Sequence, residues 1–312
     1  MTVSSRKKNY EIPEEHVFLS GHNACPGCGQ ALAIRYVLNT MGPNTISTVP
    51  PSCAAIISGP QPLSSMMLPV YQTTLESSAA SAAGIRRALN RMGKTDVNVL
   101  SIAGDGGTYD IGFQALSGAA ERNEDLVYVC LDNEGYMNTG AQKSGASPHL
   151  VQTATTPGGK PTQKKNIAEI MAAHGIPYVA TASTGFPDDL ARKVAKARDM
   201  RGTGMRFIVA LTPCLPGWGV KEDQGIAIAR LATDTGLWPL YEVEYGTKYT
   251  INRGPQGIPV REYYKLQKRY SHLTEEQVEE LQAEMEYSWQ LLKARSECIP
   301  ERGLAAGPAQ SG

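Results

Sequence analysis

One segment near the middle of the chain constrains the fold more than any other. Residues 97–103 (Val-Asn-Val-Leu-Ser-Ile-Ala) form an apolar run of strand length, and residues 126–132 (Leu-Val-Tyr-Val-Cys-Leu-Asp) form a second one. Between them, residues 111–122 have the apolar spacing of a helix. Two buried strands joined by a helix predict a parallel pair with a right-handed crossover. The chain is therefore expected to be an α/β protein.

The same alternation of strand and helix continues through about residue 212. The spacing predicts helices at residues 30–41, 76–92, 166–174 and 188–200, and strands at residues 45–49, 178–182 and 207–212. Strands that alternate with helices in this way are typical of a doubly wound, mostly parallel sheet. We expect that fold class here.

The composition changes after residue 213. We expect an N-terminal arm at residues 1–20, an α/β domain at residues 21–213, and an irregular and helical C-terminal extension at residues 214–312 that packs on a partner. Thr274-Glu-Glu-Gln277 predicts a capped helix start. The helix that follows has one apolar face, formed by Val278, Leu281, Met285, Trp289 and Leu292. This face could equally dock on the main domain.

Charge and hydropathy exclude several classes of protein. Thirty basic and thirty acidic residues give a net charge of zero, which argues against non-specific nucleic-acid binding. The hydrophobic fraction of 41% with 19% charged residues is that of a globular chain. The longest apolar stretch, at residues 207–215, is too short to cross a membrane. No apolar signal-peptide core follows the N-terminus, so we expect a cytoplasmic protein.

Two loops at strand ends carry ligand-type residues. Asp105 follows the strand at 97–103 and lies in a Gly-Asp-Gly-Gly turn, and Asn133 follows the neighbouring strand. The carboxyl ends of parallel strands meet at one edge of a sheet, so these residues should lie together. A carboxylate oxygen, an amide oxygen and a nearby backbone carbonyl form a ligand set that suits Mg²⁺. Backbone N–H groups beside them suit a diphosphate.

Familiar nucleotide-binding motifs are not met. Gly104-x-Gly106 lacks the third glycine of the dinucleotide fingerprint, because Tyr109 occupies that position. Residues 140–147 have the spacing of a phosphate-binding loop, but Ala146 stands where that loop needs lysine. We interpret this second segment as an ordinary turn.

The chain has six cysteines, too few for a disulfide scaffold at this length. Cys25 and Cys28 form a Cys-Pro-Gly-Cys turn, and Cys53 and Cys214 each follow a strand beside proline. Four thiolates in turns could hold Zn²⁺ or an iron–sulfur cluster, and their spacing does not choose between the two. Cys130 lies inside an apolar strand and is expected in the core. Cys298 has no evident role.

Together these segments resemble the thiamine-diphosphate-binding β subunit of 2-oxoacid:ferredoxin oxidoreductases. The resemblance rests on residues 21–29 (Gly-His-Asn-Ala-Cys-Pro-Gly-Cys-Gly), 104–112 (Gly-Asp-Gly-Gly-Thr-Tyr-Asp-Ile-Gly), 132–140 (Asp-Asn-Glu-Gly-Tyr-Met-Asn-Thr-Gly) and 212–214 (Thr-Pro-Cys). It extends from about residue 17 to residue 300. Within the pyruvate branch of this family, the whole chain is most similar to the β subunit of oxalate oxidoreductase.

The resemblance implies roles for matching positions. One [4Fe-4S] cluster, rather than zinc, would be held by Cys25, Cys28, Cys53 and Cys214. The side chains of Asp105 and Asn133 and the Gly135 carbonyl would bind Mg²⁺. Thiamine diphosphate would be contacted by Gln30, Cys53, Gly104, Asp105, Gly106, Gly107, Asn133, Glu134, Gly135, Tyr136, Met137 and Asn138. Asn138 would also face the substrate as a catalytic residue, and His22 is either a cofactor contact or a hydrogen-bonded loop residue.

The implied reaction is an oxidative decarboxylation in which thiamine diphosphate serves as electron sink and the cluster passes electrons to ferredoxin. Three segments depart from pyruvate enzymes and argue against pyruvate itself. Gln30 stands where relatives often carry Glu, Pro51-Ser52 replaces Thr-Gly, and Leu75-Glu76-Ser77 replaces Phe-Glu-Asn. The resemblance to oxalate oxidoreductase implies oxalate as substrate, yielding CO₂ without coenzyme A. The alternative is pyruvate or another 2-oxoacid, with coenzyme A as acyl acceptor.

One doubly wound unit supplies only the diphosphate half of a thiamine site. The resemblance implies an α-type subunit that brings the activating glutamate, a ferredoxin-like cluster-bearing subunit or domain, and assembly as a dimer of heteromers. Two other functions remain open from the residues alone. One is a zinc-stapled binding module without catalysis, and the other is a thiamine-dependent decarboxylase without redox function.

Overall fold

The structure of the chain, a computed structural model, describes residues 16–298. The predicted N-terminal arm lies largely outside the described residues, as do residues 299–312 of the predicted extension. A single sheet of eight strands runs through the described part, in the order β2-β1-β3-β4-β6-β5-β7-β8. Six of these strands are parallel to one another: β1 Thr45–Val49, β2 Val70–Gln72, β3 Asn98–Gly104, β4 Val127–Asp132, β5 Tyr178–Ser183 and β6 Arg206–Leu211.

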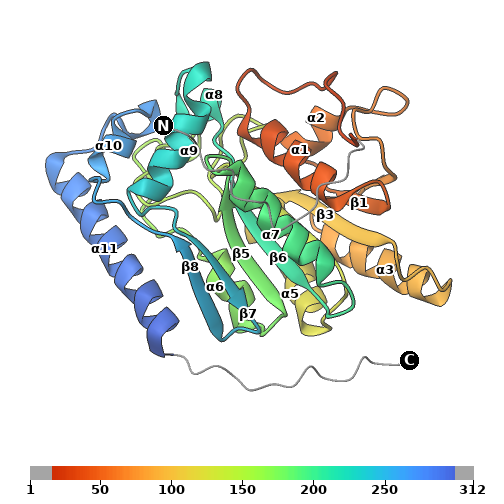
Figure 1. Ribbon diagram of the computed structural model, residues 1–312. Coiled ribbons are helices and arrows are strands. Elements are labelled where there is room, and N and C mark those ends of the chain that lie inside the picture. Colours follow the sequence, from red (N-terminus) through yellow and green to blue (C-terminus); the bar gives the residue numbers. More distant parts are fainter. Residues whose placement is uncertain (1–15, 299–312) are drawn as a thin grey trace, which may run out of the picture.

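Helices cover both faces of the sheet, so the doubly wound fold predicted from the sequence is confirmed (Figure 1). One face carries α1 Gly29–Met41, α2 Cys53–Ser58 and α7 Pro187–Asp199. The other carries α3 Ser78–Arg91, α5 Phe113–Glu121, α6 Ile167–Ala173, α9 Gly225–Asp234 and α11 Glu275–Cys298. Short helices lie between them: α4 Asp105–Tyr109, α8 Leu215–Trp218, η1 Glu222–Gln224, α10 Arg261–Tyr264 and η2 Lys268–Tyr270.

The core forms two layers because successive strand residues point to opposite faces of the sheet. On β3 and β4, Ala103 and Cys130 face the α3 and α5 side, whereas Ile102 and Val129 face the α1 and α7 side. All four are fully buried. The predicted core position of Cys130 is confirmed, and both faces of the central strands are apolar, as a parallel sheet requires.

The carboxyl ends of the central strands bring distant segments together. Gly104 at the end of β3 is in register with Leu131, and Asp132 at the end of β4 is in register with Leu211. The loops that follow these strands begin at Asp105, Asn133 and Thr212. Cys53 follows the end of β1, which pairs with β3. The sheet therefore places all four segments at one edge.

The C-terminal third contains elements that the sequence pattern did not predict. Strands β7 Leu240–Glu244 and β8 Lys248–Arg253 form an antiparallel hairpin, and β7 pairs antiparallel with β5 at the edge of the sheet. Glu242 anchors the hairpin, because its buried carboxylate accepts a hydrogen bond from Tyr178 Oη at 2.9 Å and pairs with Lys196 at 2.8 Å. This anchoring is tertiary and leaves no periodic signal in the sequence.

Helix α11 begins as predicted. Thr274 N donates to Gln277 Oε1 at 3.0 Å and Gln277 N donates to Thr274 Oγ1 at 3.3 Å, which is a reciprocal capping box. Leu281, Met285 and Leu292 are buried against the main core, so this part of the apolar face docks within the chain. Within residues 16–298, no helix has the length and apolar character to span a bilayer.

Candidate functional site

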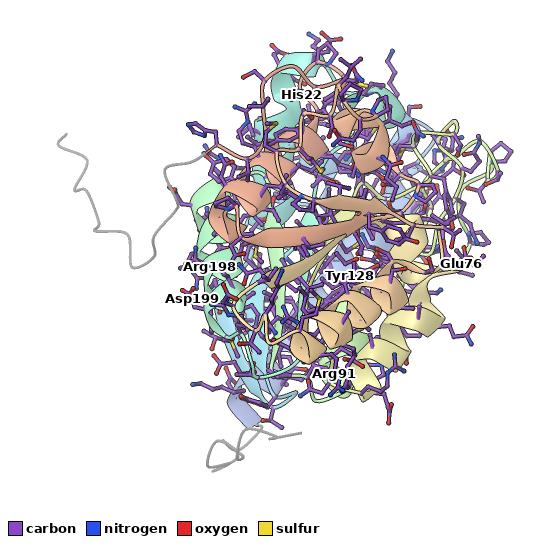
Figure 2. All side chains as sticks on the ribbon, turned by 90° about the vertical axis from the view of Figure 1, so that its right-hand side faces the viewer. His22, Glu76, Arg91, Tyr128, Arg198 and Asp199 are labelled. Carbon is purple, nitrogen blue, oxygen red and sulfur yellow. The ribbon has the colours of Figure 1, made fainter. Side chains whose placement is uncertain are left out.

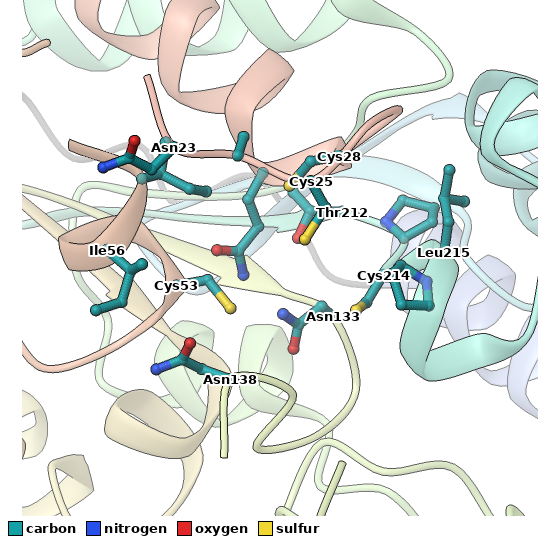
Figure 3. A pocket seen from close by; sticks show the side chains of 15 residues that line it. Asn23, Cys25, Cys28, Cys53, Ile56, Asn133, Asn138, Thr212, Cys214 and Leu215 are labelled. Carbon is teal, nitrogen blue, oxygen red and sulfur yellow. The ribbon is translucent and has the colours of Figure 1, made fainter. Parts of the chain in front are cut away.

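A small pocket lies at the carboxyl edge of the sheet (Figure 3). Its volume is about 80 Å³. The residues that line it come from the ends of β1, β4 and β6 and from the turn before α1, and they include Gln30, Asn133 and Asn138 as well as Cys25, Cys28, Cys53 and Cys214. We call this the thiol pocket. It unites the four predicted cluster ligands with three other predicted cofactor residues, Gln30, Asn133 and Asn138.

Three of the four thiol-pocket cysteines lie at helix N-termini, which corrects the expectation of plain turns. Cys28 precedes α1, Cys53 is the first residue of α2, and Cys214 precedes α8. Backbone N–H groups at such ends point outward and favour negatively charged sulfur. The sulfur atoms of Cys53 and Cys214 point toward one another across the pocket (Figure 3). Cys25 is the most exposed of the four.

Glycine is required inside the first cysteine turn. Gly27 has a φ of +70°, and a Cβ atom there would collide with the backbone carbonyl of Glu222. The Cys-Pro-Gly-Cys turn is thus packed directly against η1, a segment nearly two hundred residues away in sequence. A larger residue would move Cys25 or Cys28 away from the other sulfur atoms.

The thiols of the pocket disfavour one another's ionisation. Burial, and then the neighbouring thiolates of Cys214, Cys28 and Cys25, raise the pKa of Cys53 to about 12. Burial likewise raises the pKa values of Cys28 and Cys214, although backbone N–H groups act in the opposite direction. Four acidic groups this close need a cationic centre to become thiolates together, which is what a metal cluster provides.

A second group of ligands lies beside the pocket. The side-chain amide of Asn133 lies 3.0 Å from Asp105 Oδ1 and 2.9 Å from the Gly135 carbonyl oxygen, and its other end lies 2.9 Å from Gln30 Nε2. The three groups predicted to bind Mg²⁺ therefore converge from two loops. With its nitrogen toward Asp105, the Asn133 amide donates to both oxygens and accepts from Gln30 Nε2; with its oxygen toward Asp105, it faces two acceptor oxygens, which is favourable only with a cation between them.

The oxygen-facing orientation fits a magnesium ion. Mg²⁺ takes oxygen ligands at about 2.0–2.1 Å in octahedral geometry, so adjacent ligand oxygens lie about 3 Å apart. The spacings of 3.0 Å and 2.9 Å agree with this value. In the other orientation the amide nitrogen donates to both oxygens and stands in for the cation. The donor set is thus compatible with Mg²⁺ in size and chemistry.

Asp105 occupies an electrostatically unfavourable position without a cation. It is buried at the start of α4, where burial and the nearby Asp132 carboxylate raise its pKa well above the usual range. Ser144 Oγ donates to Asp105 Oδ2 at 2.5 Å. One hydroxyl does not offset the repulsion, so a divalent cation would stabilise the ionised carboxylate.

The glycines after β3 allow close packing around Asp105. Gly104 ends the strand, and Gly106 and Gly107 lie in the single turn of α4, where the sequence predicted only a loop. A Cβ atom on Gly106 would collide with the ring of Tyr136. Tyr136 Oη in turn donates to Asp110 Oδ2 at 2.9 Å. The two predicted diphosphate loops are therefore locked together by this contact.

Comparison with known proteins shows the family. Residues 52–210 match the family described as thiamine pyrophosphate enzyme, C-terminal TPP binding domain. The chain is 45% identical over 277 residues to the pyruvate synthase subunit PorB of Methanothermobacter marburgensis, covering 87% of this chain and 96% of that one. It is 43% identical over 304 residues to the ketoisovalerate oxidoreductase subunit VorB of Pyrococcus furiosus, covering 93% of this chain and 97% of that one. The chain belongs to the 2-oxoacid:ferredoxin oxidoreductase β subunits.

A solved structure agrees with this family. The 2-oxoglutarate:ferredoxin oxidoreductase of Magnetococcus marinus, with 2-oxoglutarate, coenzyme A and succinyl-CoA bound, superposes with a TM-score of 0.56 at 25% identity. The match covers 67% of this chain and 69% of that one. The β subunit described here is thus part of an oxidoreductase, and its matched domain is of the thiamine-diphosphate-binding type.

The remaining predicted residues lie in different environments. Asn138 is exposed at the tip of its loop and lines the thiol pocket. Gln30 is buried, and its Oε1 atom has no hydrogen-bond partner among the residues that the structure describes. Met137 packs on Gly135, whereas the Glu134 side chain turns away from Asp105 toward Lys164 and Arg269. Only the backbone of Glu134 therefore remains available to a cofactor.

His22 is a loop residue rather than part of the pocket lining. Its ring stacks on Phe18 at 5.2 Å, and its Nδ1 atom accepts from Ala24 N at 3.4 Å. In Figure 2 it lies at the end of the molecule opposite Arg91, which closes α3. It thus flanks the same edge of the sheet as the thiol pocket.

Sequence reasoning missed several residues that support the site. Trp218 Nε1 donates to the Asn133 carbonyl at 2.9 Å, and Ser147 Oγ donates to the Glu134 carbonyl at 2.8 Å. Ser144 and Ser147 belong to the segment interpreted as an ordinary turn, whose serines in fact hold both site loops. A signal was available there, because small hydroxyl residues in a glycine-containing loop often bond to backbone or carboxylate groups. No sequence signal indicated the role of Trp218.

Proposed function

We propose that this β subunit binds thiamine diphosphate through Mg²⁺ and holds one [4Fe-4S] cluster beside it, in an enzyme that oxidatively decarboxylates a 2-oxoacid. Asp105, Asn133 and the Gly135 carbonyl would hold Mg²⁺, and Cys25, Cys28, Cys53 and Cys214 would hold the cluster. The observation that carries the proposal is the thiol pocket itself, where the four cysteines and the amide of Asn133 line one cavity.

When bound, thiamine diphosphate supplies the electron sink for decarboxylation, and the cluster accepts the electrons that are released. The chain's own residues perform the positioning. Gly106 and Gly107 let the backbone approach the diphosphate, and Gln30 presents its unpartnered Oε1 atom beside the pocket. Asn138 at the pocket rim would orient the substrate. Asp105 is buried, and its interaction with a bound cation is therefore stronger than it would be in water.

We propose pyruvate or a branched 2-oxoacid as substrate, with coenzyme A as acyl acceptor. Support comes from the pyruvate synthase and ketoisovalerate oxidoreductase subunits that share 43–45% of their aligned residues with this chain. The solved 2-oxoglutarate enzyme with coenzyme A bound supports the same acceptor. These relatives favour this substrate class over oxalate, which was the main expectation from the sequence. The substitutions at Gln30, Pro51-Ser52 and Leu75-Glu76-Ser77 then distinguish substrates within the class.

We further propose that the β subunit works only with an α-type subunit and a cluster-bearing subunit. The matched domain supplies one half of a thiamine site. Large apolar side chains are exposed around the pocket: Ile56, Leu63 and Met67 are 55%, 79% and 57% exposed. Ile56 itself lines the thiol pocket. A cluster of this kind marks a surface that a partner covers.

The experiment is anaerobic reduction of a low-potential dye by the purified whole complex. Pyruvate, 2-oxoisovalerate, 2-oxoglutarate and oxalate are compared, each with and without coenzyme A. We expect coenzyme-A-dependent turnover of pyruvate or 2-oxoisovalerate by the complex. We expect the β subunit, separated anaerobically from the complex, to be brown and to contain iron and labile sulfide. Oxalate turnover without coenzyme A would contradict the proposed substrate class. A colourless β subunit with one zinc would contradict the cluster, and normal turnover by the isolated β subunit would contradict the partner requirement.

A further inference from the structure

The loop that presents the proposed Mg²⁺ ligands has an unusual backbone at its centre. Glu134 lies between Asn133 and Gly135 and has a φ of +67°. A residue with a side chain adopts this left-handed conformation at a cost of about 1–2 kcal/mol. The conformation is needed for Asn133 and the Gly135 carbonyl to face Asp105 together. Something outside the loop must therefore hold Glu134 in place.

The side chain of Glu134 is held by two cations on the side away from Asp105. Its Oε1 atom lies 3.3 Å from Lys164 Nζ, and its Oε2 atom pairs with Arg269. Lys164 Nζ also lies 2.9 Å from Asp132 Oδ2, and Tyr109 Oη donates to the same atom at 2.6 Å. We call Asp132, Glu134, Lys164 and Arg269 the ion network. It contains two acidic and two basic groups.

Arg269 makes a second, independent contact with the same loop. Its guanidinium lies 3.9 Å from the centroid of the Trp218 ring. Trp218 Nε1 donates to the carbonyl oxygen of Asn133 at 2.9 Å, and Arg269 Nε donates to Gln267 Oε1 at 2.8 Å. One buried arginine of the C-terminal extension thus braces the loop at Glu134 directly and at Asn133 through Trp218.

From these contacts we infer that Arg269 is a positioning residue for the cation site, acting through Glu134 and Trp218 on Asn133 and Gly135. The inference rests on the proposed Mg²⁺ role of these two residues. Arg269 itself does not line the thiol pocket. One guanidinium nitrogen, Nη2, pairs with Glu134 while the flat face of the group stacks on the Trp218 indole, a combination that lysine cannot reproduce. Its loss leaves Glu134 with Lys164 alone.

The test compares the wild-type complex with complexes that carry Arg269→Gln and Arg269→Lys. Each complex is stripped of divalent cations and given saturating thiamine diphosphate. Mn²⁺ binding is then followed by the EPR signal of the free ion, and Mg²⁺ dependence is followed by dye reduction. We expect Arg269→Gln to weaken Mn²⁺ binding and raise the half-saturating Mg²⁺ concentration at least about tenfold. High Mg²⁺ should restore the rate, the KM for the 2-oxoacid should not change, and Arg269→Lys should fall between.

The matched control is Arg206→Gln. Arg206 is a buried arginine at the start of β6, paired with Asp125 at the opposite edge of the sheet from the site. This variant should lose thermal stability without changing Mn²⁺ affinity. The inference is wrong if Arg269→Gln or Arg269→Lys folds and keeps wild-type Mn²⁺ affinity. It is also wrong if Arg206→Gln weakens Mn²⁺ binding as much as Arg269→Gln does. In both cases the proposed function stands. If Arg269→Gln does not fold, the lysine variant decides. If the wild-type complex itself binds no Mn²⁺ with thiamine diphosphate, both the inference and the proposed cation site fail.

Discussion

The loop at residues 132–138 separates two groups of acidic side chains that differ in how they are paired. Asn133 and Asn138 line the thiol pocket, whereas Glu134 lines a second cavity of about 410 Å³ together with Lys164. In the thiol pocket and beside it, the four cysteines and Asp105 are all acids. Lys164 acts on Asp105 and Arg269 acts on Cys214 only through their charges, without a direct salt bridge among the described residues. In the ion network, each acid has a basic partner.

Several pKa values reflect this difference. Burial and like charges raise the pKa values of Cys53 and Asp105. Burial also acts to raise the pKa of Glu134, but the charges of Lys164 and Arg269 outweigh it and lower that pKa. At Asp132, the other acid of the ion network, burial outweighs the charge of Lys164 and raises the pKa. The basic partners therefore offset burial fully at Glu134 and only in part at Asp132. The four thiols can ionise together only when a cationic centre binds among them, which supports the proposed cofactor role of the thiol pocket.

The largest expected effect comes from removing one acid from the thiol pocket. Cys53→Ser should remove the iron of one cluster per β subunit and lower dye reduction at least about 100-fold, because serine is a poor ligand for a thiolate-bound cluster. Iron and sulfide analysis and turnover of the whole complex measure this. The control is Cys130→Ala, which alters a buried core cysteine and should keep the cluster at a stability cost of about 1–2 kcal/mol. Full turnover by Cys53→Ser would instead indicate a thiamine decarboxylase without redox function.

A slightly smaller effect is expected for Asp105→Asn, on the stabilisation that cofactors give. The direction of its effect on stability without cofactors distinguishes an uncompensated charge from a paired one. Asp105→Asn removes a buried carboxylate that is repelled by Asp132, so the cofactor-free protein should be at least as stable as wild type. The stabilisation by Mg²⁺ and thiamine diphosphate should be lost, since binding raises stability only where affinity remains. Thermal unfolding with and without both cofactors measures this.

The control for Asp105 is Asp199→Asn, an exposed residue at the C-terminal end of α7 (Figure 2) that does not line the thiol pocket. It should leave the cofactor-induced rise in melting temperature unchanged. An Asp105→Asn protein that is clearly less stable than wild type without cofactors would show that Asp105 is a structural partner of Ser144 rather than an uncompensated charge.

Much of the thiol pocket, with Asp105 beside it, could be predicted from the sequence for a simple reason. Apolar runs such as residues 97–103 and 126–132 mark parallel strands, and parallel strands place their carboxyl ends side by side. Asp105 and Asn133 therefore had to meet once the strands were recognised. Cysteine and glycine are also conspicuous in sequence because few residues can replace them in a ligand set or a positive-φ turn.

The ion network could not be predicted, because the residues that pair in it share no local sequence pattern. Lys164 and Arg269 are ordinary basic residues in irregular segments, and only the three-dimensional fold brings them to Glu134. The hairpin β7–β8 was missed for the same reason, as the buried Glu242 depends on Tyr178 and Lys196 from other elements. Contacts between distant polar side chains leave no periodic signal. Periodicity found five of the six parallel strands and the helices beside them, but not β2, α9, the β7–β8 hairpin or the charged contacts that stabilise them.

A moderate effect is expected at the rim of the thiol pocket. Asn138→Ala should lower kcat/KM for the 2-oxoacid by about tenfold, or about 1.4 kcal/mol, through loss of one substrate-orienting amide. Iron content and thiamine diphosphate affinity should not change. Thr139→Val is the comparison, because it removes the hydrogen bond from Thr139 Oγ1 to Gln142 Oε1 at 2.6 Å and leaves the Asn138 amide intact. An equal loss in both variants would assign the effect to loop order.

The smallest expected effect on activity lies near the ion network, where a substitution should change stability and leave turnover unchanged. Lys160 is buried, and its Nζ atom donates to the carbonyls of Thr162 at 2.7 Å and Gln163 at 2.8 Å. Burial, followed by the charges of Lys143 and Lys164, lowers the pKa of Lys160 to about 8. The folded protein then binds fewer protons than the unfolded chain between pH 8 and the ordinary lysine pKa of about 10.4. Stability from this group rises with pH across that window and is lost as the pH falls toward 8.

Lys160→Met should therefore remove a pH-dependent part of the free energy of unfolding, on the order of 2 kcal/mol across this window, with no change in turnover at saturating cofactors. Urea unfolding of wild type and variant at several pH values between 7.5 and 10.5 measures the difference, and subtracting the two curves cancels the titration of the thiols and tyrosines. Lys94→Met, an exposed position beyond α3, should give parallel curves. Parallel curves for Lys160→Met as well would show that neither burial nor the neighbouring lysines lower the pKa of Lys160 in the folded protein.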